Sequence, residues 1–179
     1  MSRNAYVDES IRGHDYMLGV TLILASDTKA IRKRLRAMVL RGQRRIHFSS
    51  ESNHRRRALL TDIAALRTSS IVYLARHHDQ PAAREAILTT MVHDLLKEPT
   101  ARLVLESRAG QDQQDRSVIS RATGSSSRTR LSYGHEVGYH EPLLWVPDAV
   151  AWAWGRGGRW RQTVSDLGLV TEVKNIEVS

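Results

Sequence analysis

The chain has 179 residues, which suits one domain with its own hydrophobic core. It contains no cysteine, which excludes a disulfide framework, a thiolate metal site and a cysteine nucleophile. No stretch approaches the roughly 20 apolar residues that cross a bilayer. The first residues also lack the apolar core of a signal peptide, so we expect a cytoplasmic protein with no membrane partner.

The net charge is +8 and the pI is near 10.4, which favours a polyanionic partner. Most of the basic residues are arginine, whose planar group suits phosphate better than the point charge of lysine. Nucleic acid is therefore the expected partner. The same composition also occurs on solvated helix faces of proteins that bind no nucleic acid.

Hydrophobic periodicity in the first half predicts a hairpin of two strands, then helices and strands in alternation. Ser26 or Asp27 can cap the first helix, and Gly42 follows it. The predicted strands cover 5–10, 16–24, 45–49 and 70–75, and the predicted helices cover 28–41 and a segment from Asn53 to about Leu66.

The second half continues the alternation. It predicts helices over 81–97 and around 118–122, a strand over 101–105, a polar loop over 123–129 and an edge strand within 131–140. Pro147 is expected at the first position of the next helix, which three glycines after Trp154 would end. Residues 160–179 are expected to hold one short helix and a strand-like end.

This order predicts an α/β domain of three layers, with a mixed sheet between helices. Two antiparallel strands come first, and the helices and strands that follow supply the remaining layers. We find no internal repeat or interdomain linker, so a single domain over 1–179 is expected, with its core at about 5–155 and a C-terminal extension at 156–179.

Acidic residues recur where these strands end and where one helix begins. Asp8 follows a strand-like segment, Glu106 ends another, and Asp148 lies in the first turn of a helix. Ligands gather at such strand ends in α/β sheets. Converging carboxylates repel one another unless a cation joins them, and hard oxygen ligands suit Mg²⁺ or Mn²⁺. Two such ions can activate water and stabilise the leaving oxygen in phosphodiester cleavage.

Three motifs carry a resemblance to a family. They are Tyr-Val-Asp-Glu-Ser at 6–10, Leu-Val-Leu-Glu-Ser-Arg at 103–108 and Pro-Asp-Ala-Val-Ala-Trp-Ala at 147–153. Together with the apolar second strand, they resemble a large and mostly uncharacterised bacterial family that is assigned a ribonuclease H-like fold. The resemblance covers about residues 6–154.

The resemblance implies a ribonuclease H-like fold and a carboxylate set that binds metal. Carried over by motif, that set is Asp8, Glu106, Asp115 and Asp148, which would be both catalytic and metal-binding, with Glu9 and Asp112 in reserve. Family members usually have Gly after Asp-Glu-Ser and have Gln-x-Ala-Asp at the last motif. This chain has Ile11 and Trp145-Val-Pro-Asp there, and it keeps Asp8 and Asp148.

Each acid also has a structural interpretation. Asp8 can begin a polar loop, and Asp148 can stabilise the helix dipole. Glu106 can pair with Arg102 or Arg108, and Asp115 can cap a helix.

Other residues suggest how a polyanion would be held. A phosphate-binding surface is expected on two basic helices, from Arg32, Lys33, Arg36, Arg55 and Arg56. The histidines lack the helical spacing of a zinc pair, and only His135 or His140 is a candidate for proton transfer. Trp145, Trp152 and Trp154 can stack on bases or belong to the core.

The leading hypothesis is therefore a divalent-metal-dependent nuclease. The alternative is a non-catalytic module that binds nucleic acid or protein on the same fold. A metal-dependent transferase or phosphatase for small phosphates is a third hypothesis, and the basic surface argues against it.

Overall fold

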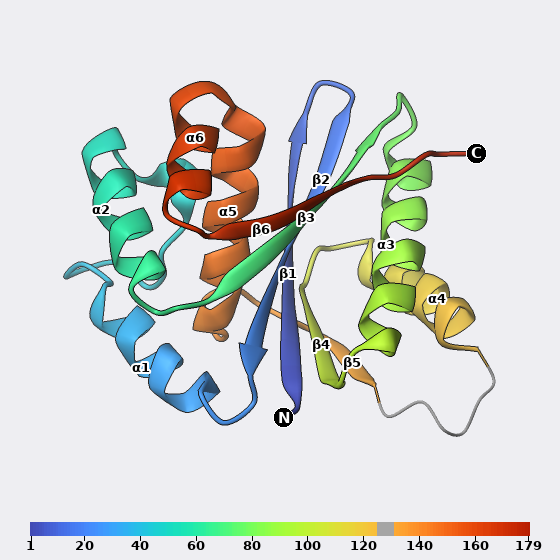
Figure 1. Cartoon of the computed structure of the whole chain (residues 1–179), viewed down its shortest axis with the longest axis horizontal. Helices are drawn as coiled ribbons and strands as arrows, with labels where there is room; N and C mark the ends of the chain where they lie inside the picture. Colours follow the sequence, from blue (N-terminus) through green and yellow to red (C-terminus); the bar gives the residue numbers. More distant parts are fainter. Residues whose placement is uncertain (125–130) are drawn as a thin grey trace.

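The computed structural model of the chain describes residues 1–124 and 131–179. Six strands form one mixed sheet in the order β5-β4-β1-β2-β3-β6 (Figure 1). The strands are β1 (Arg3–Arg12), β2 (Asp15–Leu24), β3 (Ser69–Arg76), β4 (Thr100–Glu106), β5 (Ser132–Glu136) and β6 (Val170–Asn175). The sheet lies between helical layers, so the three-layer α/β class expected from the sequence is confirmed.

The β1–β2 hairpin forms the middle of the sheet, as its pattern predicted. Its strands pair antiparallel from Arg3 with Leu24 to Arg12 with Asp15, and Gly13 turns the chain with a φ of +59°. β1 pairs parallel with β4 on its other side, with Val7 opposite Leu105. The carboxyl ends of β1 and β4 therefore meet at the same edge of the sheet.

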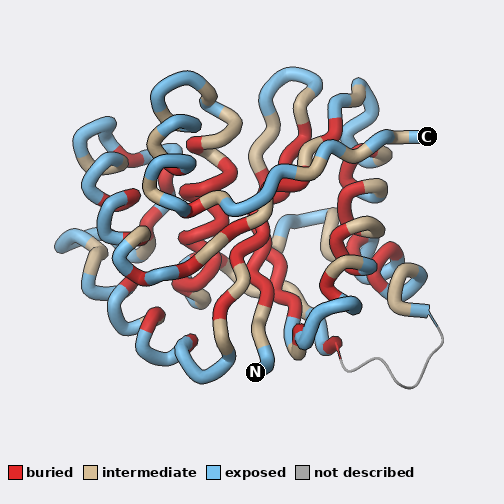
Figure 2. Tube along the Cα trace, in the orientation of Figure 1, coloured by how far each residue is buried: buried red, intermediate tan, exposed pale blue. Residues whose placement is uncertain are grey.

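Helices cover both faces of this sheet. On one face lie α1 (Thr28–Ala37), α2 (Asn53–Ala64), α5 (Trp145–Arg156) and α6 (Gly158–Asp166), and on the other lie α3 (Gln80–Lys97) and α4 (Asp112–Thr123) (Figure 1). Burial is concentrated in the central strands and on the helix faces turned to them (Figure 2). The pleat divides β1 between two core clusters, with Tyr6 on the α5 face and Ala5 and Val7 on the α3 face.

The segment over 45–49 is not a strand, so that prediction was wrong. Ile46 and Phe48 are buried in the core on the α5 face, and a single 3-10 turn covers Phe48–Ser50. Both edges of the described sheet are already occupied, by β5 and β6, and neither pairs with this segment. Alternating apolar residues thus anchor a loop here instead of a strand.

Helix boundaries also differ from the predictions. α1 ends at Ala37 instead of Arg41. α5 begins at Trp145, directly after a 3-10 turn at Pro142–Leu144, so Pro147 is its third residue. That position is still in the first turn, where the missing N–H of proline costs no hydrogen bond. The loop predicted over 123–129 falls mostly on 125–130, which lie outside the described residues.

Residues 156–179 contribute α6 and β6 to the fold. β6 pairs parallel with β3, from Ser70 with Val170 to Leu74 with Asn175. The sheet therefore reaches beyond the core of 5–155 that the sequence predicts. Among the helices described, none has the length and apolar character needed to cross a membrane.

A close approach between helix and sheet occurs at Gly19 of β2. A Cβ atom built there would lie 2.9 Å from the backbone oxygen of Pro147 and 3.3 Å from the Cβ of Ala151. Only glycine lets α5 approach the hairpin so closely.

We expect Gly19→Ala to lower the free energy of unfolding by about 1–3 kcal/mol, because α5 must move away from β2. Gly134→Ala is the matched control, since a Cβ there meets nothing within 4 Å. Urea denaturation of both variants checks the prediction. Equal free energies of unfolding for the two variants would contradict the prediction, because α5 could then move away from β2 without loss of stability.

Candidate active site

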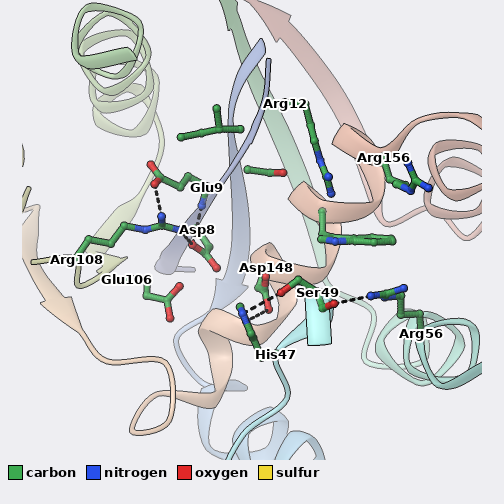
Figure 3. Close-up of a pocket in the computed structure, with 13 residues that line it drawn as sticks. Asp8, Glu9, Arg12, His47, Ser49, Arg56, Glu106, Arg108, Asp148 and Arg156 are labelled. Atoms are coloured by element: carbon green, nitrogen blue, oxygen red, sulfur yellow. Dashed lines mark hydrogen bonds and ion pairs between the residues drawn. The ribbon is translucent and has the colours of Figure 1, made fainter. Parts of the chain in front are cut away.

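A pocket of about 490 Å³ opens where β1 and β4 end and α5 begins. Its acidic floor combines Asp8 of β1, Glu106 of β4 and Asp148 of α5 (Figure 3). Strand pairing brings the first two together, because Val7 lies opposite Leu105 and the next residues are Asp8 and Glu106. The pleat places Asp8 on the same face as Tyr6, and this is the face that α5 covers.

The three acids are withdrawn from solvent. Asp8 is 5% exposed and Asp148 is 7% exposed. Burial raises the pKa of Asp8 well above its usual range, and the negative charges of Asp148 and Glu106 raise it further. A carboxyl group held in this way gains from any cation that reaches it.

Each acid also has a partner in the protein. Asp8 accepts a hydrogen bond from the backbone N–H of Glu9 at 2.7 Å, and its Oδ1 lies 3.4 Å from Arg108. Glu106 pairs with Arg45 at 2.9 Å. Basic groups thus neutralise part of the acidic floor.

Asp148 is held by the loop that contains the 3-10 turn. Its Oδ2 accepts a hydrogen bond from the N–H of Phe48 at 2.9 Å and lies 3.5 Å from Nδ1 of His47. Hydrogen bonding to Asp148 raises the pKa of His47, although partial burial opposes this. The loop that was predicted to be a strand therefore supplies an imidazole to the pocket.

The structure places Asp115 apart from this pocket. It lies on the α3 face, where Arg84 donates to both of its oxygens at 2.7 Å and His135 lies 3.0 Å away. Burial raises the pKa of Asp115, but hydrogen bonds from Arg84 and His135 outweigh it and hold the pKa at about 2. Three of the four predicted acids thus converge, and the fourth belongs to a buried ion-pair network.

The two reserve acids have separate positions. Glu9 follows Asp8 in the strand, so its side chain turns to the opposite face, where it pairs with Arg84 and accepts from Tyr16. Arg108 contacts Glu9 as well as Asp8. Asp112 accepts from the hydroxyl of Ser107 and the N–H of Arg108, and so fixes the turn after β4.

Of the basic residues predicted to bind phosphate, Arg56 lines the pocket. Arg32 is paired with Glu141 at 2.8 Å, and Arg55 donates to the backbone oxygen of Met38. Lys33 and Arg36 are exposed on α1. The reserve acid Glu9 also lines the pocket. The remaining lining residues were not assigned to it by sequence reasoning, namely Ser10, Ile11, Arg12, His47, Ser49, Arg108, Trp152 and Arg156.

No signal in the sequence marks Arg12, His47, Ser49 and Arg156, since they come from a loop and from element ends. Trp152 was a candidate for stacking on bases, and Arg108 was a candidate partner of Glu106. The two candidate histidines lie elsewhere. The side chain of His135 is buried beside Asp115, and His140 is exposed next to Tyr139.

The carboxylates of the pocket can be compared with the ligands that a divalent metal ion requires. Within 1–124 and 131–179, no group of three or more His, Cys, Asp or Glu side chains is arranged to hold a metal ion as it stands. The three pocket carboxylates nevertheless supply the hard oxygen atoms that Mg²⁺ and Mn²⁺ require. Burial first, and then the charges of Asp148 and Glu106, raise the pKa of Asp8. The residues fit a divalent cation by chemistry.

We expect Asp8→Asn to stabilise the metal-free protein at pH 7–8. The pKa of Asp8 is higher in the folded state than in the unfolded chain, so its ionisation favours unfolding as pH rises. The gain should shrink as pH falls towards 4, where the unfolded Asp is itself protonated. Thermal unfolding of both proteins with chelator, from pH 4 to 8, checks this. A gain that does not vary with pH would contradict it.

Asp115→Asn should destabilise the protein. The pKa of Asp115 is about 2 in the folded state, so its ionised form stabilises the fold at pH values above the ordinary pKa of Asp. The loss should be about 2 kcal/mol near pH 7 and should fade as pH drops from 4 to 2. Denaturant titrations measure it, with Asp62→Asn on the exposed surface of α2 as the control. An Asp115 variant as stable as the control at pH 7 would refute the structural role.

Comparison with known proteins supports the fold. No protein-family model matches the sequence, and no curated protein was found to resemble it. The ribonuclease H2 of Pyrococcus horikoshii OT3 superposes with a TM-score of 0.60 at 16% identity, over 93% of this chain and 77% of that one. Ribonuclease HII of Archaeoglobus fulgidus, solved in complex with PCNA, gives 0.56 at 16% identity, over 93% and 78%. The chain therefore has the ribonuclease H-like α/β fold that its motifs led us to expect.

Proposed function

We propose that this protein is a divalent-metal-dependent nuclease. The observation that carries the proposal is that Asp8, Glu106 and Asp148 converge in one pocket rimmed by arginines. About 100 residues separate the first two acids in the sequence, and about 40 separate the last two. The similarity to two ribonucleases supports it, since their fold is shared. Membership of the uncharacterised bacterial family remains a prediction.

The three pocket acids would hold Mg²⁺ or Mn²⁺, which when bound would supply an activated water and charge stabilisation at the leaving oxygen. Asp8 would be a ligand together with Glu106 and Asp148, whose charges already act on its carboxyl group. Asp115 is proposed as a positioning residue instead of a ligand: it anchors Arg84, which in turn holds Glu9.

The rim would bind the phosphate backbone. Arg12, Arg56 and Arg156 lie on one side of the acids, and Arg108 lies on the other (Figure 3). A guanidinium group can donate two hydrogen bonds to one phosphate, so the rim can orient a strand across the acidic floor. His47, which Asp148 favours in its protonated form, can donate a proton to the leaving oxygen.

One observation favours the alternative of a non-catalytic module. Arg45, Arg108 and His47 already partner the acids, and no metal-binding group is arranged among the described residues. A protein that had lost metal binding could keep such a pocket neutral with its own cations. Binding of nucleic acid or protein would then be the whole function.

We expect purified protein to cleave nucleic acid with Mn²⁺ or Mg²⁺ and not with chelator. Asp8→Asn and Asp148→Asn should each lower the rate by about 100-fold or more, because each removes an oxygen ligand. The assay uses labelled single- and double-stranded RNA and DNA and an RNA–DNA hybrid, which also identifies the substrate. Asp62→Asn is the matched control.

Metal binding is measured separately, by thermal unfolding with and without Mn²⁺. A nuclease should gain stability from the ion, and both pocket variants should lose that gain. Inert protein that gains no stability from either ion would overturn the nuclease and support the binding module. Cleavage that survives in both variants would move the active site elsewhere.

A further inference from the structure

Three tryptophans and five arginines form a continuous surface on α2, α5 and α6, beginning at the pocket. We call it the Arg–Trp surface, and it comprises Arg12, Arg56, Arg57, Arg156, Arg161, Trp152, Trp154 and Trp160. Trp152, Arg12, Arg56 and Arg156 line the pocket itself, and the other members lie outside it. The three helices that carry most of it lie together on one face of the sheet (Figure 1).

Four of the five arginines of this surface lie over tryptophan rings, and Arg156 is the exception among the described contacts. The guanidinium carbon of Arg56 is 4.2 Å from the ring centre of Trp152, and that of Arg12 is 5.7 Å from the same centre. Arg161 lies 5.0 Å from the ring centre of Trp154. Such cation–π contacts hold a guanidinium group flat against a ring. Arg56 also donates to the backbone oxygens of Phe48 and Ser49 and to the side chain of Asn53, and Arg161 donates to the backbone oxygen of Trp154.

The same arrangement continues away from the pocket. Arg57 lies 6.0 Å from the ring centre of Trp160, and the rings of Trp160 and Trp152 meet edge to face at 5.4 Å. All three tryptophans are partly exposed. Trp152 and Trp160 thus link the pocket to Arg57, whereas Arg161 and Trp154 form a separate pair.

These arginines lack the carboxylate partners that other arginines have. Arg32, Arg45, Arg84 and Arg108 each pair with an acid. In the part of the chain that the structure describes, none of the five arginines of the Arg–Trp surface forms such an ion pair. Burial lowers the pKa of Arg56, Glu51 raises it, and neighbouring Arg156 and Arg12 lower it again. Like charges therefore crowd here, and a polyanion would relieve their repulsion.

We propose that the Arg–Trp surface binds a single-stranded segment of nucleic acid that leads away from the pocket. The side chains of Arg12, Arg57 and Arg156, which form no hydrogen bond or ion pair among the described residues, supply phosphate contacts. The rings and guanidinium planes supply platforms on which bases stack. A duplex buries the faces of its bases, so it could use only the phosphate contacts. The inference rests on the proposed nuclease for its direction towards the pocket, but the binding itself requires no cleavage.

The test measures binding in chelator, so no strand is cut. Fluorescence anisotropy follows a 12-mer of deoxythymidine, the same length with abasic sites, and a 12-base-pair duplex, each over a series of salt concentrations. Arg57→Gln with Arg161→Gln removes two charges outside the pocket. Lys29→Gln with Arg116→Gln removes two exposed charges from α1 and α4 and serves as the matched control.

We expect the single strand to bind about tenfold more tightly than the abasic strand, because stacking is lost without bases. The Arg57/Arg161 variant should weaken single-strand binding by about tenfold and reduce the salt slope by roughly 1, as fewer phosphates are neutralised. The control variant should change affinity by less than about twofold. Circular dichroism confirms that both variants fold.

Three results would each overturn the inference: equal binding of the abasic strand, a duplex bound as tightly as the single strand, or a control variant as weak as the Arg57/Arg161 variant. Failure of the nuclease is distinguishable from these. Protein that binds the single strand as expected but cuts nothing with Mn²⁺ or Mg²⁺ would keep the Arg–Trp surface and refute the nuclease.

Discussion

The candidate site depends on the close packing of α5 against the β1–β2 hairpin. Gly19 lets the backbone of Pro147 come within van der Waals distance of β2, and Asp148 is the next residue along the helix. β1 lies beside β2 and carries Asp8 on the same face of the sheet. If α5 packed further from the sheet, Asp148 would lie further from Asp8 and Glu106. The acidic floor of the pocket would then lose one of its three carboxylates.

The buried acids on the two faces of the sheet differ in how far basic side chains neutralise them. On the α3 face, Asp115 and Glu9 share the guanidinium of Arg84, so opposite charges offset the cost of burial. On the α5 face, Asp8 lies among other acids, and its raised pKa shows that compensation is incomplete. A site that keeps uncompensated carboxylates costs stability, which is expected where a protein binds cations. The alternation of β1 separates these two environments by a single residue, since Asp8 and Glu9 are neighbours.

The arginines fall into two groups: those that pair with acids, and those that lie over tryptophan rings without an ion pair among the described residues. Some arginines that pair with acids join two elements in partly buried contacts, as Arg32 joins α1 to the turn at Glu141. Those over the tryptophans are held by aromatic rings and form no ion pair among the described residues, although Arg56 and Arg161 also donate to neighbouring oxygen atoms. The net charge of +8 therefore does not spread evenly over the surface. Three arginines that form no ion pair among the described residues, Arg12, Arg56 and Arg156, line the acidic pocket, where a phosphate backbone and metal ions would be needed together.

The sequence by itself determined the hairpin, the alternation of helices and strands, and the candidacy of Asp8, Glu106 and Asp148, because hydrophobic period and strand ends are local properties. It also contained the alternation that separates Asp8 from Glu9. Only the tertiary structure decided that Asp115 faces Arg84, that His47 reaches Asp148 from a loop, and that the last strand completes the sheet. Those outcomes depend on which elements pack together. The residues in contact are 31 to 101 positions apart, and such contacts produce no hydrophobic periodicity in the sequence.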